Sequence, residues 1–292
     1  MSSIIQFQEA LSCKDLRAQI VKTCKYLIAS ECHTKPSLAI ISVGEDQASA
    51  VYVRQKEKLC DDIGITCTHL HICDDNITTE DVIKVVHACN ECNYSGIIVQ
   101  LPLPSNLDQR KIVNEIDPLR DVDCLTDINM GRLYSGNQYL TPCTPTGIID
   151  YCLNNNISLC GKRVTVIGRS NIVGRPVAAL FEQHNATVTL CHSHTSRYDL
   201  EKACWGADII VCAVGKENFL NISLVSSGTL VFDVGINRGE DGKLHGDVSA
   251  VTHNCSSIHV TPVPGGVGIL TVAELCLNVI KACIEQERNG EL

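Results

Sequence analysis

A tyrosine and a lysine four residues apart are the first pair in this sequence that could do chemistry. Tyr52 and Lys56 lie in the segment ASAVYVRQKEK, and on a helix residues with this spacing share one face. Ser49 and Ala50 are small and leave room for a ligand against that face. A lysine held near an apolar surface can act as a general acid or base near neutral pH. For an isolated pair, a solvated lysine beside a half-buried tyrosine is the more ordinary interpretation.

A glutamine ends a short apolar run farther along the chain. The segment GIIVQLPLP predicts a buried strand over Gly96–Gln100, because the prolines that follow stop further pairing. Ligands of α/β folds bind outside the carboxyl ends of parallel strands. Gln100 is therefore expected to reach Lys56 or a substrate.

Two acidic residues on a later loop could recognise the polar edge of a ligand. Asp121 and Asp123 stand in the segment DPLRDVD, where their carboxylates could bind amide and amino groups. Paired acids on loops are also commonly solvated, or cap local backbone N–H groups. The sequence leaves these interpretations open.

A glycine loop after a strand indicates a binding site for a dinucleotide. The strand VTVIG leads into GRSNIVGRP and then the helical segment VAALFEQH. Small residues let a pyrophosphate approach backbone N–H groups at the positive end of a helix. The spacing differs from G-x-G-x-x-G, because Ser170 replaces the second glycine and Gly174 comes one place late. A plain turn with structural glycines remains an alternative.

The end of the next strand bears on the choice between NAD and NADP. An NAD site places an acid about 20 residues after the glycine loop, on the ribose hydroxyls. Here the strand ends LCHSHT without an acid, whereas Arg169, Ser193, His194 or Arg197 could meet a 2′-phosphate. The sequence therefore predicts NADP over NAD.

Short apolar runs alternate with amphipathic segments along the whole chain, which indicates βα units and an α/β fold with parallel sheets. Helices are expected over Ala48–Asp62, Glu80–Cys92 and about Leu270–Glu287, and from Val177. The predicted strands are Ser37–Val43, Thr66–Ile72, Gly96–Gln100, Arg163–Ile167, Thr187–Cys191, Asp208–Val214, Leu230–Val234 and His259–Val263.

The length of 292 residues predicts about two domains, at about 150 residues each. Prolines interrupt the alternation between Pro102 and Thr146, so we place a domain junction there. We expect two α/β domains with an active-site cleft between them, the C-terminal one a Rossmann-type parallel sheet. The first comprises residues 1–144 plus 270–292, and the second residues 145–269.

Charge and hydropathy disfavour several classes of partner. The chain carries 33 acidic and 24 basic side chains, a net charge of −9, so we expect neither nucleic acid nor an anionic membrane as a partner. The longest segment without Asp, Glu, Lys or Arg, Val248–Ala273, contains prolines and glycines and is unsuited to span a membrane. The first residues have the features of neither a signal peptide nor a transit peptide, so we expect a cytoplasmic protein.

Six motifs, in a fixed order over essentially the whole chain, closely resemble the bifunctional methylenetetrahydrofolate dehydrogenase/cyclohydrolase family. They are YVRQK (Tyr52–Lys56), GIIVQLPLP (Gly96–Pro104), DVD (Asp121–Asp123), PCTPTG (Pro142–Gly147), GRSNIVGRP (Gly168–Pro176) and TPVPGGVG (Thr261–Gly268).

The resemblance implies two reactions in one cleft: NADP-dependent oxidation of methylenetetrahydrofolate to methenyltetrahydrofolate, and hydrolysis of that product to formyltetrahydrofolate. It implies that Lys56 is the general acid/base of the hydrolysis and that Gln100 tunes it. It also implies that Tyr52 stacks on the folate and that Asp123 holds the pteridine ring. The last helix would pack on the first domain, and the protein would be a homodimer.

The resemblance assigns binding residues to both ligands, and no metal to the site. It places the following residues at the cofactor: Gly168, Arg169, Ser170, Ile172, Gly174, Ser193, His194, Thr195 and Ile236. It places the following at the folate: Tyr52, Lys56, Val99, Gln100, Leu101, Asp123, Pro264, Gly265, Gly266 and Thr271.

Three positions depart from the family's usual pattern. Ile269 stands where a proline is expected at a helix start, which would alter the folate-side wall slightly. His194 stands where Arg or Lys is usual, which weakens the 2′-phosphate clamp and makes it pH-dependent if His194 contributes. Ser249 stands where an acid is common, and the sequence offers no physical account of that change.

The 18 cysteines are scattered evenly and are expected to be reduced thiols in core positions. Cys89 and Cys92 form a C-x-x-C late in a predicted helix, a weak signal for metal or redox chemistry because no second pair accompanies it. Cys124, Cys143 and Cys191 lie in or beside the motifs, which predicts sensitivity to thiol reagents.

Two other functions remain compatible with parts of the pattern. A monofunctional NAD(P)-dependent Rossmann dehydrogenase would need the glycine loop but would have no use for Lys56. A folate or dinucleotide sensor without turnover would need neither Lys56 nor Gln100 as proton-transfer groups. Steady NADPH production would exclude the sensor, and accumulation of methenyltetrahydrofolate would favour the lone dehydrogenase.

Overall fold

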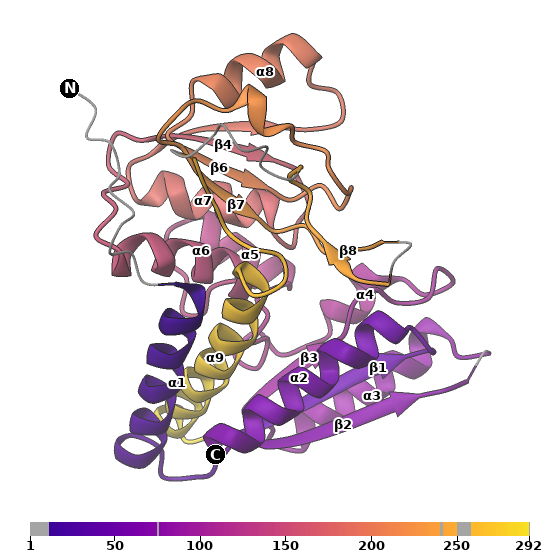
Figure 1. Cartoon of the computed structure of the whole chain (residues 1–292). Helices are drawn as coiled ribbons and strands as arrows, with labels where there is room; N and C mark the ends of the chain where they lie inside the picture. The colour runs from indigo at the N-terminus through magenta and orange to yellow at the C-terminus, as the bar shows by residue number, and fades with distance from the viewer. Residues whose placement is uncertain (1–11, 75, 240–241, 250–257, 292) are drawn as a thin grey trace. The chain divides into compact units, whose positions relative to one another are not determined.

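Two parallel sheets organise the chain, one in each of two units (Figure 1). The computed structural model describes residues 12–74, 76–239, 242–249 and 258–291. One unit, here the three-stranded unit, contains Ala18–Cys143 and Val272–Leu292. The other, the five-stranded unit, contains the described residues up to Arg17 and Thr144–Thr271. Each unit therefore has its own α/β core.

The sheet of the three-stranded unit has the order β2-β1-β3, with all strands parallel. Its strands are β1 (Ser37–Val43), β2 (Thr66–Ile72) and β3 (Gly96–Val99). Figure 1 shows α2 (Gln47–Ile63) in front of this sheet and α3 (Thr79–Glu91) behind it. The other helices of this unit are α1 (Cys13–Ser30), α4 (Gln109–Val113), α5 (Asp127–Tyr134) and α9 (Val267–Asn289), of which α1 and α9 begin in the five-stranded unit.

The central strand β1 is apolar on both faces because both are covered. Ala39, Ile41 and Val43 belong to one core cluster with Val82 and Val86 of α3. Successive strand residues point to opposite faces, so Leu38 and Ile40, also fully buried, face the other side. Parallel strands buried on both faces have near-continuous apolar sequences, as β1 does.

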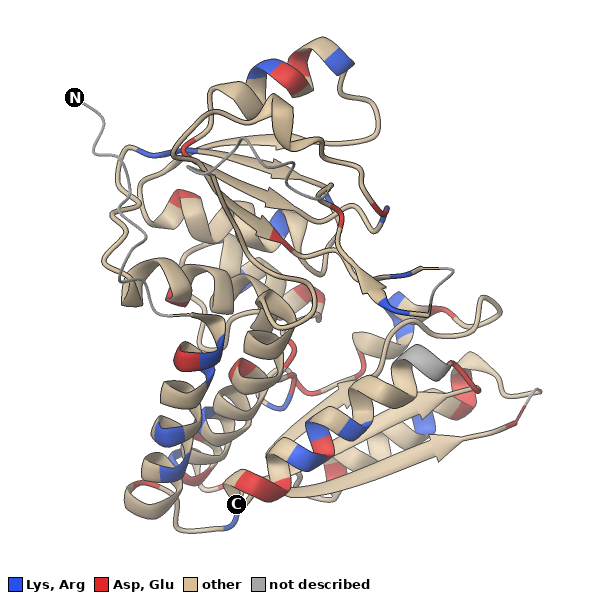
Figure 2. Cartoon of the chain, in the orientation of Figure 1, with Lys and Arg blue, Asp and Glu red and all other residues tan. Residues whose placement is uncertain are grey.

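Local signals set the ends of α2. The Asp46 carboxylate accepts a hydrogen bond of 2.7 Å from the Ser49 N–H and caps the first turn. The helix ends at Gly64, which has a φ of 103°. This start and stop determine which of its side chains face the sheet and which face outward. Figure 2 shows Lys, Arg, Asp and Glu mixed along the outer turns of this helix.

A capping box starts α3: the Thr78 hydroxyl accepts from the Asp81 N–H, and the Asp81 carboxylate accepts from the backbone of Thr78. Hydrogen bonds from Thr78 and then Lys84 lower the pKa of Asp81 from 3.8 to about 2. An acid whose pKa is lower in the folded than in the unfolded protein stabilises the fold at pH values above its unfolded-state pKa. That contribution is lost as the pH falls toward its folded-state pKa.

Replacing Thr78 by alanine is therefore expected to lower the free energy of unfolding by about 1 kcal/mol at neutral pH. The contribution of Asp81 should disappear as the pH falls from about 4 to about 2. Denaturant titrations at neutral pH and near pH 3 measure both effects. Asp81→Asn should lack this part of the pH dependence, and an unchanged pH dependence in that variant would contradict the assignment.

Helix α9 has the length and apolar composition of a membrane span, but 67% of its most apolar window is buried inside the fold. Val279 of α9 lies close to Gly96 of β3, where a Cβ would come within 3.1 Å of it. The Asn278 side chain donates to the carbonyl oxygens of Val122 (2.9 Å) and Thr141 (2.8 Å). These contacts are those of a core helix in a folded domain, with its polar groups paired inside the protein.

The sheet of the five-stranded unit has the order β10-β7-β6-β4-β5, with all strands parallel. Its strands are β4 (Arg163–Ile167), β5 (Thr187–Cys191), β6 (Ile209–Cys212), β7 (Leu230–Asp233) and β10 (His259–Val260). The helices are α6 (Cys143–Asn154), α7 (Gly174–Gln183), α8 (Arg197–Trp205) and the 3₁₀ turn η1 (Ile222–Leu224); β8 (Asn237–Arg238) and β9 (Leu244–His245) form a small antiparallel pair.

Every predicted strand is present. The ranges of β1, β2, β4 and β5 agree with the prediction, whereas β3, β6, β7 and β10 end one to three residues early. Those early ends lie at the carboxyl edges of the sheets, where the chains leave the ladder to form loops. The backbone N–H of Gln100 still donates to the Ile41 carbonyl (2.8 Å), so the sheet continues one bond beyond β3.

Candidate active site

The predicted contact between Lys56 and Gln100 is present in the three-stranded unit. Lys56 of α2 is only 7% exposed, and its Nζ donates to Oε1 of Gln100 at 3.0 Å. The other end of the amide, Nε2, donates to the Leu101 carbonyl at 2.8 Å. That second bond orients the amide so that its oxygen faces the amine. The sheet edge thus holds a buried lysine in one position by an uncharged acceptor.

Tyr52 and Ser49 lie on the same side of α2 as Lys56, at helical spacings of four and seven residues. Tyr52 is half-buried, and desolvation raises the pKa of its phenol, so the ring is neutral at physiological pH. The Ser49 hydroxyl is buried without a hydrogen-bond partner among the described residues. A buried hydroxyl of this kind is costly unless a ligand or water pairs with it. The sequence analysis treated Ser49 only as a small residue.

A pocket of about 190 Å³ opens at the carboxyl end of this sheet. Ser49 and Gln100 both line it, together with the end of β1, the first turns of α2 and residues of β2. The two polar groups beside Lys56 thus face one open space, at the edge where parallel sheets bind ligands.

The two acids of the DVD motif have different environments. Asp121 is 1% exposed and accepts bonds from the Thr126 N–H (2.9 Å), the Leu125 N–H (3.2 Å) and Asn129 Nδ2 (3.0 Å). Desolvation raises the pKa of this carboxyl. Asp121 therefore organises the following loop, which is the capping role that the sequence left open beside ligand binding. Asp123 is half-buried, with the Cys143 thiol 3.5 Å from its carboxylate, and remains the candidate for ligand binding.

Steric contacts explain both glycines of the dinucleotide loop. Gly168 follows β4 with a φ of 115°, and a Cβ there would lie 2.1 Å from the Ala213 carbonyl oxygen. A Cβ on Gly174 would lie 2.0 Å from the Gly168 carbonyl oxygen. The Ser170 hydroxyl accepts from the N–H groups of Val173 (3.2 Å) and Gly174 (3.4 Å) at the start of α7. A serine in place of the second glycine thus closes the loop with its own side chain. Ile172 of this loop is exposed.

A tight turn after β5 presents the residues expected near a 2′-phosphate. The His192 N–H donates to the Thr195 hydroxyl (2.9 Å), and the Thr195 N–H donates to the His192 carbonyl (2.8 Å). Ser193 and His194 at the tip are exposed, as is Arg169. Arg197 is paired with Glu201 at 2.7 Å, which makes it a poorer candidate for the phosphate.

Two buried aspartates, which the sequence analysis did not single out, hold the neighbouring loops. The Asp247 carboxylate accepts from the N–H groups of Val214 (2.7 Å), Gly215 (2.9 Å) and Lys216 (2.9 Å). Asp233, at the end of β7, accepts from the N–H groups of Gly235, Asp247 and Val248. The exposed Ile236 follows directly. The clue in the sequence was GDV at 246–248.

Ser249 and Ile269, which depart from the family's usual pattern, also have local hydrogen-bond partners. The Ser249 hydroxyl accepts from the Ile222 N–H at 3.4 Å, at the start of η1. The Ile269 N–H donates to the Gly266 carbonyl at 3.3 Å in the first turn of α9, a bond that a proline could not make. Both residues therefore fit their places without strain.

The turn before α9 requires glycine. Gly265 has a φ of 98°, and a Cβ on Gly266 would lie 2.3 Å from the Pro262 carbonyl oxygen. Pro264, exposed, follows a cis peptide bond. Thr271, one turn into α9, contacts the Thr144 hydroxyl at 2.8 Å. These contacts lie within the five-stranded unit.

Two family models match consecutive parts of the chain. Tetrahydrofolate dehydrogenase/cyclohydrolase, catalytic domain, matches residues 11–123, and its NAD(P)-binding domain matches residues 142–287. The chain belongs to the tetrahydrofolate dehydrogenase/cyclohydrolase family. Tyr52, Lys56, Gln100 and Asp123 lie in the first match, and the glycine loop lies in the second.

Individual relatives agree with this membership. The bifunctional protein FolD of Acetivibrio thermocellus is 43% identical over 277 residues, which cover 94% of this chain and 96% of that protein. The crystal structure of FolD from Campylobacter jejuni has a TM-score of 0.88 and 37% identity, over 94% of this chain and 98% of that one. A Trypanosoma brucei enzyme complexed with NADP and an inhibitor has a TM-score of 0.85 and 31% identity, over 96% and 99%.

As a member of this family, the chain is an enzyme. None of its cysteines is among the candidate catalytic or binding residues. Cys124, Cys143 and Cys191 are at most 3% exposed, and desolvation raises the pKa of each thiol. Buried thiols with raised pKa values react slowly, so burial argues against a fast reaction at these three, and sensitivity to thiol reagents stays a prediction. Cys89 of the C-x-x-C is buried in the core, and Cys92 is exposed.

Proposed function

We propose that this enzyme oxidises methylenetetrahydrofolate to methenyltetrahydrofolate with NADP and hydrolyses that product to formyltetrahydrofolate, with Lys56 as the general acid/base. The observation that carries the proposal is the buried amine of Lys56, held 3.0 Å from the Gln100 amide oxygen in a chain that also has a dinucleotide loop. A dehydrogenase alone has no use for a proton-transfer group in this position, because hydride transfer mainly requires orientation.

NADP, when bound, accepts the hydride that leaves the methylene carbon together with its electron pair. The backbone of Gly168–Gly174 and the amino end of α7 are suited to its pyrophosphate, because the glycines allow close approach and the helix dipole favours an anion. Arg169, Ser193, His194 and Thr195 bind the 2′-phosphate, and Ile236 contacts the cofactor from the loop after β7. The net charge of −9 does not attract these anions, so local positive groups must do so.

Hydrolysis of the methenyl group needs two proton transfers. Water forms a new C–O bond at the methenyl carbon while Lys56 takes one of the water protons. The carbon–nitrogen bond then breaks as Lys56 returns that proton to the leaving nitrogen, and the new hydroxyl group loses its own proton to solvent as it becomes the formyl C=O. Gln100 accepts a hydrogen bond from Nζ and keeps the amine aimed at the reacting carbon.

Other residues are proposed to contact the folate. Tyr52 offers a neutral ring one turn before Lys56 on which the folate can stack, and the Ser49 hydroxyl offers an unpaired donor. Asp123 accepts from the amino and ring N–H groups of the pteridine. Val99, Leu101, Thr271 and the turn Pro264–Gly266 complete the folate contacts.

The cofactor assignment can be measured directly. We expect kcat/KM for NADP to exceed that for NAD, and Arg169→Ala to raise KM for NADP by roughly tenfold, because one exposed charge-assisted contact is worth about 1.4 kcal/mol. KM for NAD should change little. Lys202→Ala, which removes an exposed charge from α8, is the control. Equal losses with both cofactors would contradict a 2′-phosphate role for Arg169.

Assembly and location complete the proposal. We propose a homodimer that acts in the cytoplasm on tetrahydrofolate one-carbon derivatives, as the resemblance of the motifs implies. The mixed charges and the burial of α9 are compatible with that setting.

A further inference from the structure

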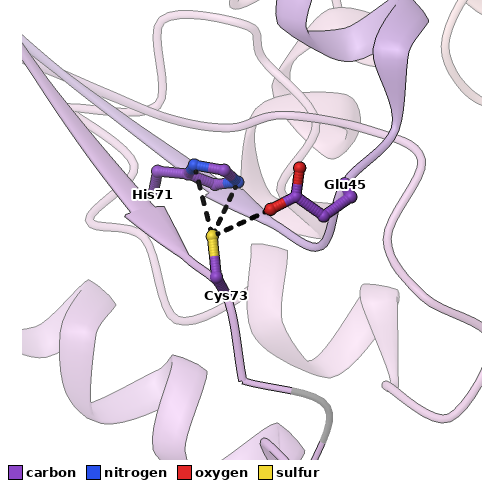
Figure 3. A group of neighbouring side chains, drawn as sticks. All are labelled: Glu45, His71 and Cys73. Carbon is purple, nitrogen blue, oxygen red and sulfur yellow. Dashed lines mark hydrogen bonds between the residues drawn. The ribbon is translucent and has the colours of Figure 1, made fainter.

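Three side chains with different donor atoms meet at the carboxyl end of the β1–β2 pair (Figure 3). Glu45 follows β1, while His71 lies at the end of β2 and Cys73 just beyond it. One ligating atom of each lies within 4.8 Å of the others, and all three residues are exposed. We propose that this Glu45–His71–Cys73 cluster binds a zinc ion.

The distances from the sulfur to the other two donors are close to those of a tetrahedral site. The Cys73 sulfur lies 3.3 Å from Oε1 of Glu45, and 3.5 Å and 3.4 Å from Nδ1 and Nε2 of His71. With ordinary zinc–sulfur, zinc–nitrogen and zinc–oxygen bond lengths, tetrahedral angles place the sulfur about 3.5 Å from the nitrogen and oxygen ligands. An ion can therefore enter between these side chains once the imidazole turns its Nδ1 toward it.

The histidine is held in the tautomer that a metal ligand needs. Its Nε2 lies 2.9 Å from the Gly44 carbonyl oxygen, which can only accept, so Nε2 carries the proton. The lone pair is then on Nδ1, which is the nitrogen that would bind the ion. A backbone carbonyl that orients the far nitrogen of a histidine is the usual support of a zinc ligand.

Strand pairing holds the backbone beneath these ligands. Val43 is paired with Ile72 in the parallel ladder, and the Gly44 N–H donates to the Ile72 carbonyl at 2.9 Å. Gly44 then turns the chain with a φ of 82°, which places Glu45 beside the end of β2. The cluster thus rests on the sheet of the three-stranded unit, and a rigid base of this kind favours metal binding.

The donor set selects the kind of ion. A thiolate and an imidazole are poor ligands for Mg²⁺ or Ca²⁺, whereas Cys, His and Glu together suit Zn²⁺. The negative charges of the thiolate and of Glu45 neutralise the ion. Glu45 and Cys73 also line a pocket of about 410 Å³, which leaves space for water as the fourth ligand. Binding breaks the Cys73 S–H bond and releases one proton, so zinc affinity should rise with pH.

The test uses the full-length, reduced, metal-free protein and a chromophoric chelator that competes for zinc. We expect one zinc site whose affinity falls roughly tenfold or more in Cys73→Ser, because loss of a direct ligand should cost at least as much as loss of an orienting partner. Glu45→Gln, nearly isosteric, should weaken the same site. Mg²⁺ at equal concentration should not compete. Cobalt in place of zinc should show a thiolate charge-transfer band that Cys73→Ser abolishes.

Cys92→Ser is the matched control, since Cys92 is another exposed thiol but belongs to no three-ligand group among the residues that the structure describes. Its zinc affinity and its cobalt band should equal those of the unmodified protein. His87→Gln removes an exposed histidine that pairs with a carboxylate without a thiol, and should likewise have no effect. Equal zinc affinity in Cys73→Ser and the unmodified protein would overturn the proposal, as would a wild-type protein that binds no zinc.

Discussion

Lys56→Ala is expected to lower kcat for hydrolysis of methenyltetrahydrofolate by about 10²- to 10⁴-fold, the usual contribution of a positioned general acid/base. Its Nζ is the amine that the Gln100 amide orients at 3.0 Å. The affinity for NADP should stay near normal, because the dinucleotide loop lies in the other unit. A spectroscopic assay of methenyltetrahydrofolate consumption, with the substrate supplied directly, measures the loss.

Two further variants separate proton transfer from charge. Arginine is always protonated, so Lys56→Arg keeps the positive charge but cannot take a proton from water, and it should be nearly as inactive as Lys56→Ala. Lys58→Ala removes an exposed lysine from the same helix and should hydrolyse normally. Full hydrolysis in Lys56→Arg would mean that Lys56 contributes charge alone.

Gly174→Ala is expected to disable oxidation while leaving hydrolysis intact. Its Cβ would lie 2.0 Å from the Gly168 carbonyl oxygen, so the loop must move by about 1 Å before the contact becomes tolerable. A displacement of that size in a positioning element can cost roughly 100-fold in rate. Overpacking should also lower the free energy of unfolding by about 1–3 kcal/mol.

The measurements are kcat/KM with NADP, kcat for hydrolysis of supplied methenyltetrahydrofolate, and thermal unfolding. Gly206→Ala is the control, because its Cβ would come no closer than 3.4 Å to its nearest neighbour, the Lys202 carbonyl oxygen. A Gly174→Ala enzyme that oxidises methylenetetrahydrofolate at the normal rate would show that the loop tolerates a side chain at its closest backbone contact.

Local sequence was enough to predict the sheets. Strands such as Ser37–Val43 are continuous apolar runs bounded by breaking residues, so hydrophobicity alone marks both ends. The ends of β6 and β10 were placed too late because apolar residues continue into the loops at the sheet edge. After β6, the N–H groups of Val214, Gly215 and Lys216 donate to the Asp247 carboxylate, and this acceptor comes from a distant segment of the chain.

Part of the candidate site could also be predicted from the sequence, and part could not. Lys56 and Gln100 were predictable together, because a helix face and a strand end each have a direction that the sequence reveals. The role of Asp121 stayed open because its partners at Leu125, Thr126 and Asn129 become evident only once the following loop folds back.

The zinc cluster was likewise invisible in the sequence. Glu45 and Cys73 are far apart along the chain, and only the β1–β2 register brings them together. The sequence analysis assigned no metal ion, because no ligand spacing within a single segment called for one.

The most direct test of the account is the yield of both products from one preparation. Purified enzyme is given methylenetetrahydrofolate and NADP, and NADPH, methenyltetrahydrofolate and formyltetrahydrofolate are quantified over time against an enzyme-free control. We expect NADPH and formyltetrahydrofolate to appear in equal amounts with little methenyltetrahydrofolate, and Lys56→Ala to accumulate the methenyl compound instead. NADPH formation with accumulating methenyltetrahydrofolate in the unmodified enzyme would contradict it.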